Sequence, residues 1–367
     1  MRDERHDDSH RAHPERRRGR GAVTNVSGRF EALRRENFDD GWGGLDETPA
    51  PLRTEITRDT SKTIIATNES PDIGFDRSIN PYRGCEHGCI YCFARPTHAY
   101  LGLSPGLDFE SKLFIKPDAP ALLRKALSRR GYQCRPIALG TNTDPYQPLE
   151  KRLGITREVL KVLAAFNHPF SIVTKSNLVA RDIDVIAPMA RRGLAKVCIS
   201  VTSLDRKLAR RMEPRAPTPQ RRLEALAALS EAGVPTGVML APLIPALNDV
   251  ELEKILQAAA ETGVREASYI FLRLPLEIKE LWREWLAEHY PDRADRISSL
   301  IRQSRGGRDY DHRFGKRMTG EGPYAKMIAD RFEVALRRLA MDRTDMAPLD
   351  TTQFRPPPEA RAQLELF

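Results

Sequence analysis

Short runs of β-forming residues alternate with helical patterns through the middle of this 367-residue chain, and this alternation restricts the possible folds most strongly. Apolar runs rich in β-branched and aromatic residues predict buried strands over residues 136–140, 170–174, 196–202, 236–241 and 267–272. Strands that alternate with helices form parallel sheets, because a right-handed crossover returns the chain to the same end of the sheet. The alternation therefore predicts an α/β fold.

The segments between these strands carry helix-end signals. Thr156 is a candidate helix cap, Thr218 precedes a proline at a helix start, and Asn248 with Glu251 has the spacing of a capping box. No G-x-G-x-x-G follows the first strand, which makes a dinucleotide-binding fold the weaker choice. About six β/α units predict a partial (β/α)6 TIM-type barrel, with chemistry at the carboxyl ends of its strands.

Composition divides the chain into four parts. Residues 1–55 are rich in charge and are predicted to form a basic, largely disordered arm, either solvated or bound to nucleic acid. We predict the core barrel over residues 70–275, a helical extension over residues 276–345, and a disordered tail over residues 346–367. The extension contains two helical stretches around a basic, glycine-rich segment.

Charge and cysteine content exclude several classes of protein. Lys and Arg number 59 against 50 Asp and Glu, a net charge of +9 that favours a polyanionic partner such as nucleic acid. The longest apolar stretch is too short to span a membrane, and the charged N-terminus lacks the apolar region of a secretory signal. Five cysteines are too few for a disulfide scaffold of this length. We expect a cytoplasmic metalloprotein.

Three cysteines in one short loop give the strongest chemical signal. Cys85, Cys89 and Cys92 are separated by four and three positions, and Gly84 and Gly88 let the loop fold tightly. A cubane cluster has four irons, so three thiolates leave one iron open to a small molecule. His87 or His98 as a fourth ligand would instead give a zinc site, and three unligated cysteines are the remaining alternative.

Polar residues follow three consecutive strands. Asp144 comes after the second predicted strand, Lys175 after the third, and Ser200 lies in the fourth. Together these side chains offer an acceptor for an ammonium group and donors for a carboxylate. Taken singly, a turn aspartate, a solvated lysine and a core serine explain them equally well.

The cysteine loop, with aromatic Tyr91 just before the last cysteine, resembles the signature of the radical S-adenosylmethionine (SAM) enzymes. The resemblance implies that Cys85, Cys89 and Cys92 hold a [4Fe–4S] cluster whose fourth iron is chelated by SAM. It also implies reductive cleavage of SAM to a 5′-deoxyadenosyl radical, an electron donor such as flavodoxin or ferredoxin, and a partial β/α barrel.

Residues 73–274 look like the branch of this superfamily that includes the spore photoproduct lyases. The resemblance assigns five residues to the SAM site: Tyr91, Thr143, Asp144, Lys175 and Ser200. It places residues 240–245 against adenine.

One departure from that branch concerns a hydrogen donor. Thr141 stands where photoproduct lyases carry a hydrogen-donating cysteine, and Cys134 and Cys198 are the only spare thiols. Cys198 lies in an apolar run and is expected in the core, so an uncharacterised subfamily with its own substrate fits best.

Two C-terminal segments suggest partners. Residues 314–324 are basic and glycine-rich; they are expected to close the open side of the barrel, with Lys316 and Arg317 on a phosphate-bearing substrate or simply solvated. The last five residues resemble the pentapeptide with which bacterial repair proteins bind the sliding clamp. Its anchoring residues are Gln363, Leu364, Leu366 and Phe367. A chance apolar end is the alternative.

The leading hypothesis is a radical SAM enzyme that acts, lyase-like, on DNA lesions or modified bases, as in DNA repair. The first alternative keeps the radical chemistry and changes the substrate to RNA, a peptide or a small molecule. The second is a non-enzymatic, metal-stabilised nucleic-acid-binding module.

Overall fold

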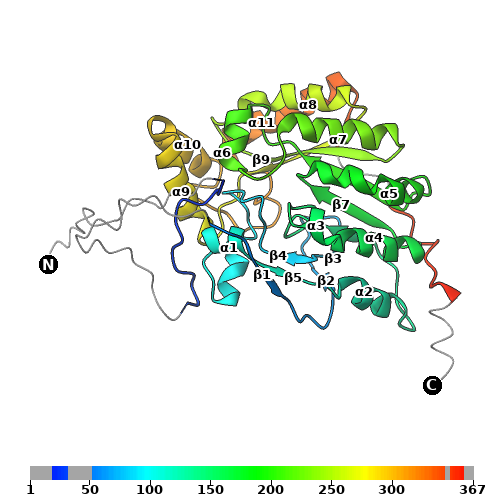
Figure 1. Ribbon diagram of the computed structural model, residues 1–367. Coiled ribbons are helices and arrows are strands. Elements are labelled where there is room, and N and C mark those ends of the chain that lie inside the picture. Colours follow the sequence, from blue (N-terminus) through cyan, green and yellow to red (C-terminus); the bar gives the residue numbers. More distant parts are fainter. Residues whose placement is uncertain (1–18, 32–51, 344–347, 359–367) are drawn as a thin grey trace.

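An eight-stranded sheet forms the centre of the molecule (Figure 1). The computed structural model describes residues 19–31, 52–343 and 348–358. The strand order is β11-β10-β9-β8-β7-β6-β3-β2, in which β2 is antiparallel to β3 and all other neighbours are parallel. The strands are β2 Ile65–Thr67, β3 Arg77–Ile79, β6 Ile137–Leu139, β7 Phe170–Thr174, β8 Ala195–Ser200, β9 Thr236–Leu243, β10 Glu266–Phe271 and β11 Asp342–Arg343.

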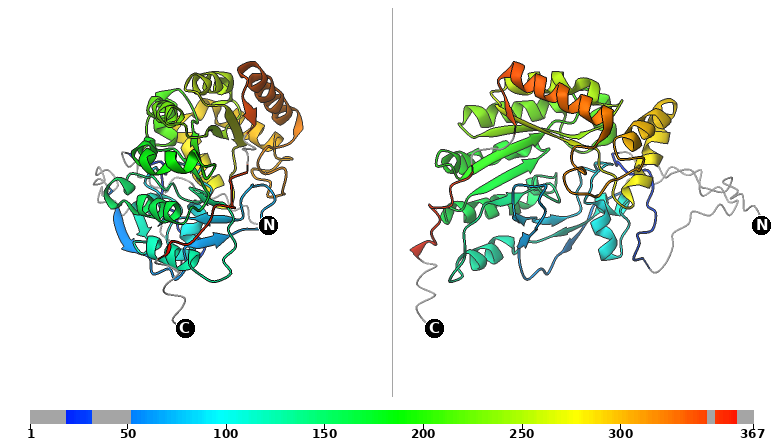
Figure 2. Two further views of the ribbon diagram at one scale, coloured as in Figure 1. Left: turned by 90° about the vertical axis from the view of Figure 1, so that its right-hand side faces the viewer. Right: turned by 180° about the vertical axis from the view of Figure 1, so that it is seen from behind.

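The five strands predicted from apolar runs are β6 to β10, and β3 precedes them as the first parallel strand. Helices cover the outer side of the curved sheet (Figures 1 and 2). They are α2 Ala119–Leu127, α4 Ile155–Ala165, α5 Ile183–Ala190, α7 Pro219–Glu231, α8 Leu252–Glu261 and α11 Gly322–Leu339. Seven consecutive parallel strands, the last of them the two-residue β11, with helices outside confirm the partial barrel, whose strand order ends at β2 and β11.

A smaller sheet sits beside the amino-terminal half of the barrel. Its order is β1-β5-β4, with β1 Glu55–Arg58, β4 Tyr82–Arg83 and β5 Lys112–Ile115. The 3₁₀ helix η2 Arg95–Leu101 and helix α1 Leu107–Ser111 pack next to it. The three-cysteine loop lies between β4 and η2, so this small sheet holds the loop at its start.

Two predicted helix caps are wrong. The Thr156 side chain lies inside α4 and donates to the carbonyl of Pro145 at 2.6 Å, while Gly154 occupies the cap position. Asn248 and Glu251 form no capping box, because the side-chain amide of Asn248 donates to the Thr202 carbonyl at 2.7 Å. The Thr218 cap of α7 is confirmed, since its hydroxyl accepts from the Arg221 amide.

Shorter helices complete the chain. The 3₁₀ helices are η3 Asn177–Asp182 and η4 Asp249–Glu251. The remaining α-helices are α3 Glu150–Leu153, α6 Arg206–Met212, α9 Ile278–His289 and α10 Pro291–Gln303. None of the helices in the described ranges is long and apolar enough to cross a membrane.

The predicted arm and tail differ from the structure wherever they are described. Residues 19–31 lie against the protein, with Ala22 and Val23 buried and the Arg20 guanidinium donating to the Glu110 carbonyl at 2.6 Å. In the tail, the Arg355 amide donates to the Phe166 carbonyl at 3.0 Å, and the Phe354 ring packs on the Phe166 ring. These contacts with the rest of the protein offset the entropy cost of ordering the two segments. The prediction of disorder considered only the composition of the segments themselves. The predicted clamp peptide, residues 363–367, lies outside the described residues.

Candidate active site

A pocket opens at the carboxyl ends of β6 to β10, where a parallel barrel places its chemistry. The cysteine loop forms one wall, and the residues at or near these strand ends form the rest. Seven of the eight predicted site residues line it: Cys85, Cys89, Tyr91, Cys92, Asp144, Lys175 and Ser200. Thr143 does not; its hydroxyl donates to the Tyr82 carbonyl at 2.9 Å, so it braces the start of the cysteine loop.

Gln147 and Glu110 fix the shape of the cysteine loop. The Gln147 amide donates to the Gly84 carbonyl at 3.2 Å, and its oxygen accepts from the Glu86 amide at 2.9 Å. Gly88 has a φ of +67°, and a Cβ there would lie 2.6 Å from the Glu110 carboxylate. The loop therefore needs glycine at this position for both conformation and space.

Arg95 is the main internal support of the loop. Its guanidinium is fully buried and donates to the carbonyls of Gly88 at 3.1 Å and Cys89 at 2.9 Å. It also donates to the Pro105 and Gly106 carbonyls and pairs with Glu110. The planar fork of arginine lets one side chain hold all these groups, which lysine does not match.

The three loop cysteines are free thiols that share one wall of the pocket. Burial raises the pKa of Cys89 to about 12 and the pKa of Cys85 well above its ordinary value. Thiolates at such a site form when a cation is present to be ligated, and three thiols on one wall of the pocket suit a cluster with one open iron.

Only one of the two histidines of the zinc alternative lies at the pocket. His98 lies outside it, with Nε2 2.9 Å from the Lys112 carbonyl oxygen and its ring against Phe109. His87 lines the pocket, and its Nδ1 lies 3.3 Å from the Asp144 carboxylate. Neither Cys134 nor Cys198 lines the pocket, and Cys198 is buried in β8 as expected.

Asp144 organises the strand ends rather than offering free acceptors. One carboxylate oxygen accepts from the Tyr146 amide at 2.9 Å and the Thr174 hydroxyl at 2.6 Å, and the other from the Lys175 amide at 2.8 Å. Burial raises the pKa of Asp144, but the attraction of His87 and these hydrogen bonds outweigh it and lower the pKa to about 2. Asp144 therefore stays ionised and joins β6, β7 and the cysteine loop.

Lys175 brings a cation to the cysteine wall. Its Nζ lies 5.7 Å from the centre of the Tyr91 ring. Burial alone would lower the pKa of Lys175, but the attraction of Cys89 and Glu213 outweighs it and raises the pKa. A charged ammonium at this place can bind a carboxylate that enters the pocket.

Sequence reasoning missed a buried acid, Glu213, behind Tyr91. The Tyr91 hydroxyl and the Arg222 guanidinium both donate to its carboxylate, as does the Thr202 hydroxyl at 2.6 Å. Burial raises the pKa of Glu213, but the attraction of Arg222 and Lys175 outweighs it and lowers the pKa to about 2. In the sequence Glu213 is one acid among several arginines, a pattern typical of a solvated surface.

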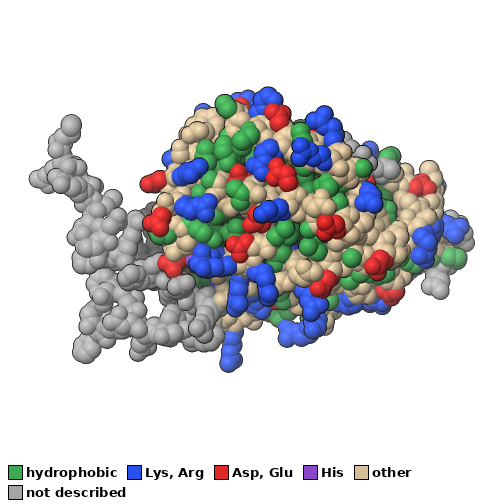
Figure 3. Space-filling view, turned by 90° about the horizontal axis from the view of Figure 1, so that it is seen from above, with side chains coloured by type: hydrophobic (Ala, Val, Ile, Leu, Met, Phe, Trp, Pro, Cys, Tyr) green, Lys and Arg blue, Asp and Glu red, His purple; other side chains and the backbone are tan. Residues whose placement is uncertain are grey.

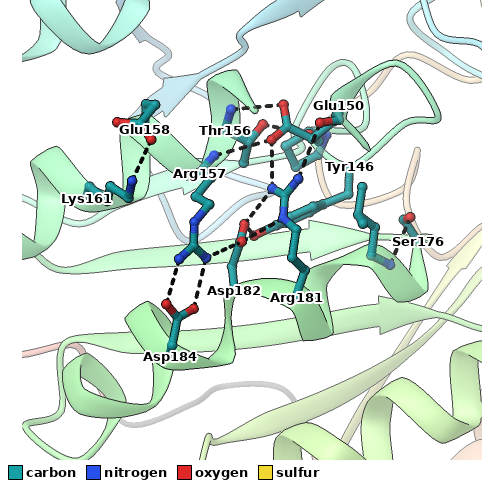
Figure 4. A network of polar contacts seen from close by, with 12 residues as sticks. Tyr146, Glu150, Thr156, Arg157, Glu158, Lys161, Ser176, Arg181, Asp182 and Asp184 are labelled. Atoms are coloured by element: carbon teal, nitrogen blue, oxygen red, sulfur yellow. Dashed lines mark hydrogen bonds and ion pairs between the residues drawn. The ribbon is translucent and has the colours of Figure 1, made fainter. Parts of the chain in front are cut away.

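A second polar network lies behind the turn that follows β6 (Figure 4). The Glu150 carboxylate accepts from the Thr156 amide at 3.0 Å, from Arg181 at 2.9 Å and from the Tyr82 hydroxyl. Asp182 accepts from the Tyr146 hydroxyl at 3.1 Å and from both Arg157 and Arg181. This network anchors Tyr82, and so the start of the cysteine loop, to the helices.

The segment 314–324 crosses the open side of the sheet, as expected, but its basic residues are paired within the protein. Arg317 forms an ion pair with Asp72, and the Gly315 amide donates to the same carboxylate at 2.6 Å. Lys316 pairs with Glu321. The prediction that Lys316 and Arg317 bind a phosphate is therefore not supported. Arg273, which lines the pocket after β10, was not predicted from the sequence.

Comparisons with known proteins identify the family. Residues 79–259 match the family model described as Radical SAM superfamily. An uncharacterised protein of Mycobacterium tuberculosis is 38% identical over 65% of this chain and 72% of its own length. One of Methanocaldococcus jannaschii is 28% identical over 67% and 88%.

Solved structures show the same fold. A spore photoproduct lyase complexed with dinucleoside spore photoproduct has a TM-score of 0.55 at 16% identity, covering 78% of this chain and 80% of that one. A mutant of that enzyme with bound AdoMet and the dinucleoside has a TM-score of 0.54 with the same identity and coverage. The superfamily uses a [4Fe–4S] cluster and SAM, and these are the cofactors of this enzyme. The chain belongs to the radical S-adenosylmethionine superfamily.

Proposed function

We propose that this enzyme cleaves SAM reductively to a 5′-deoxyadenosyl radical, with the cluster held by Cys85, Cys89 and Cys92. The observation that carries the proposal is that these thiols line the same pocket as Lys175 and Ser200. When bound, the cluster supplies the electron that splits the sulfonium. The protein supplies three thiolates and leaves the fourth coordination position to SAM.

The other pocket residues fit the parts of SAM. Lys175 offers an ammonium group and Ser200 a hydroxyl to the carboxylate. Met239, Ala241 and Pro242, from β9, give the apolar surface on which adenine packs. Asp144 acts through its neighbours, because its hydrogen bonds set the positions of Lys175 and His87. Tyr91 closes the pocket beside Lys175.

As substrate we propose a DNA lesion or a modified base. The net charge of +9 suits a polyanion, and the lyase of similar fold has been solved with a dinucleoside photoproduct. Thr141 in place of a donor cysteine argues against the same hydrogen return, so a different lyase-like or repair reaction is proposed. RNA, a peptide or a small molecule is the alternative substrate class.

Anaerobic reconstitution tests the chemistry. We expect about four irons per chain, and 5′-deoxyadenosine formation when dithionite and SAM are added. Cys89→Ala should abolish both, whereas Cys198→Ala should preserve both, because Cys198 lies in β8 outside the pocket. Zinc in place of iron, or unchanged 5′-deoxyadenosine from Cys89→Ala, would refute the proposal.

Substrate class is tested with the same preparation. Irradiated duplex DNA, RNA and peptide pools are incubated with enzyme, SAM and dithionite, and 5′-deoxyadenosine is counted together with altered bases. Stimulation by DNA with a changed base supports the DNA proposal; stimulation by another class assigns the alternative.

Binding of residues 363–367 to the bacterial sliding clamp is a separate proposal that rests on the sequence of the tail. Removal of these five residues should abolish recovery of the chain on immobilised clamp. Equal recovery with and without them would remove this partner.

A further inference from the structure

A groove beside α6 holds three cations that form no ion pair within the described residues. It is lined by α6 and by residues 213–219, and Arg206, Lys207 and Arg210 line it with exposed side chains. Within the described residues none of these three forms an ion pair, whereas the nearby arginines at 215, 221 and 222 each pair with a glutamate. We call this feature the basic groove.

The acids beside the basic groove are already engaged. Glu213 lines the groove, and its carboxylate accepts hydrogen bonds from Arg222, Tyr91 and Thr202. Asp205 caps α6, since its carboxylate accepts from the amides of Lys207 at 2.7 Å and Leu208 at 3.3 Å. By contrast, the face over α7, α8 and α11 mixes acidic and basic side chains (Figure 3). Within the part of the chain that the structure describes, the three cations of the groove therefore have no ion-pair partner.

Two hydrogen-bonded side chains span the wall between the basic groove and the active-site pocket. Glu213 lines the groove, Tyr91 lines the pocket, and the two side chains are hydrogen-bonded to each other. The backbone makes two more links to the cysteine loop: the Ile90 amide donates to the Met212 carbonyl at 3.0 Å, and the Arg215 amide to the His87 carbonyl at 3.3 Å.

The wall between the groove and the pocket limits the kind of partner that can act from the groove. A substrate must bring its reacting atom into the pocket, and the buried Arg222–Glu213 pair blocks that route from the groove. An electron needs no opening, because it crosses a thin layer of packed protein. A partner in the basic groove would thus lie near the cysteine loop without entering the pocket, which suits electron delivery better than substrate binding.

We propose that the basic groove is the docking site of an acidic one-electron carrier protein that bears a flavin or an iron–sulfur cluster. In the docked complex the carrier is oxidised by one electron, and the cluster of this enzyme is reduced by one. Charge complementarity gives the carrier its orientation and its association rate. The inference rests on the proposed function, because that function requires the electron.

The test compares two triple variants that change charge equally. Arg206→Glu/Lys207→Glu/Arg210→Glu alters the basic groove, and Lys125→Glu/Arg129→Glu/Arg130→Glu alters exposed cations on and after α2 that form no ion pair within the described residues. Helix α2 lies at the bottom of the view in Figure 1 and α6 at the upper left. Each reconstituted protein is assayed for 5′-deoxyadenosine with dithionite and with reduced flavodoxin, and for its affinity for oxidised flavodoxin.

The groove variant should match the wild type with dithionite, while its flavodoxin-driven rate and its affinity fall at least tenfold. The control variant should stay within about twofold of wild type in both, and raised salt should weaken wild-type binding. Equal flavodoxin affinity in the two variants overturns the proposal, as does loss of duplex DNA binding by the groove variant with unchanged flavodoxin binding. If the wild type forms no 5′-deoxyadenosine with dithionite, the proposed function is refuted instead. The affinities of the variants for flavodoxin then still test whether the basic groove is the docking site.

Discussion

The Tyr91 hydroxyl donates a hydrogen bond to the buried carboxylate of Glu213, and so ties the three-cysteine loop to the segment that follows α6. The same carboxylate receives the Arg222 guanidinium, which donates to the Ser200 carbonyl at 3.1 Å. Two walls of the pocket are thereby joined through one acid. Lys175 lies over the Tyr91 ring, so its position also depends on this contact.

Removal of the acid should cost far more than removal of the hydroxyl. Glu213→Ala leaves the buried Arg222 charge unpaired, which typically costs about 3–5 kcal/mol. Tyr91→Phe removes one hydrogen bond from a carboxylate that keeps Arg222 and Thr202, and should cost about 1 kcal/mol. Urea unfolding of the two variants measures both values. Equal losses would show that Glu213 does not hold Arg222 in place.

Gly140, between β6 and Asp144, is expected to tolerate no side chain. Its φ is +84°, and a Cβ would lie 1.9 Å from the Val173 carbonyl oxygen. Gly131 has a similar φ of +79°, but a Cβ there would have no atom within 4 Å. A substitution at Gly131 therefore measures the strain of the left-handed conformation without a steric clash. Gly131→Ala should cost about 1–2 kcal/mol, and Gly140→Ala should cost more and reduce SAM binding. Unfolding and SAM-binding titrations check the pair, and similar results for both variants contradict the expectation.

Much of the fold and of the cysteine site could be predicted from local patterns. Strands β6 to β10 are short apolar runs that a parallel sheet buries on both faces, so their composition reports their position. The spacing of Cys85, Cys89 and Cys92 places three thiols in one loop, and that loop lines the pocket. Features that depend on sequence neighbours were therefore accessible without the structure.

Polar pairs between residues that lie far apart in the chain could not be predicted from the sequence. No local pattern marks Arg95, Glu213 and Arg222 as buried, yet each is buried because a partner neutralises it. Arg317 was expected to meet substrate, but its partner, Asp72, lies 245 positions away in the chain. A charged residue in the sequence indicates that its burial would be costly. The sequence around it does not show which distant residue will pair with it and offset that cost.

Arg95 should control how well the cluster is incorporated. Arg95→Lys keeps a positive charge for Glu110 but loses the fork that holds the carbonyls of Gly88 and Cys89. We expect less than half of the wild-type iron after reconstitution, with retained far-ultraviolet circular dichroism. Arg124→Lys, an exposed position on α2, is the control and should bind iron normally. Full iron content in Arg95→Lys would mean that the loop is held by its other contacts.

Asp144 should affect SAM through geometry rather than charge. Asp144→Asn replaces an acceptor oxygen by an amide that faces donors from Thr174, Lys175 or His87. We expect SAM to bind about tenfold more weakly, a loss of about 1.4 kcal/mol, while iron content stays at the wild-type level. Equilibrium dialysis of the reconstituted protein with labelled SAM measures this, and Asp184→Asn, at an exposed pair with Arg157, is the control. Unchanged affinity would assign Asp144 to the loop structure alone.

The pair of Asp72 and Arg317, which closes the open side of the barrel, should weaken in acid. Burial raises the pKa of Asp72, but the Gly315 amide and Arg317 outweigh it, so the native pKa lies below the unfolded value. A lowered native pKa stabilises the folded state above about pH 4, and this stabilisation is lost as pH falls through the native pKa.

Asp72→Asn should consequently lower Tm by about 1–3 °C at pH 7, and the difference from wild type should shrink as pH drops below about 4. Asp118→Asn, which removes an exposed pair with Arg58, should change Tm little at either pH. Calorimetry at both pH values gives the comparison. A difference that stays constant with pH would mean that segment 314–324 is held by its backbone hydrogen bonds, such as the one from the Phe271 amide to the Met318 carbonyl at 2.7 Å, and not by the carboxylate of Asp72.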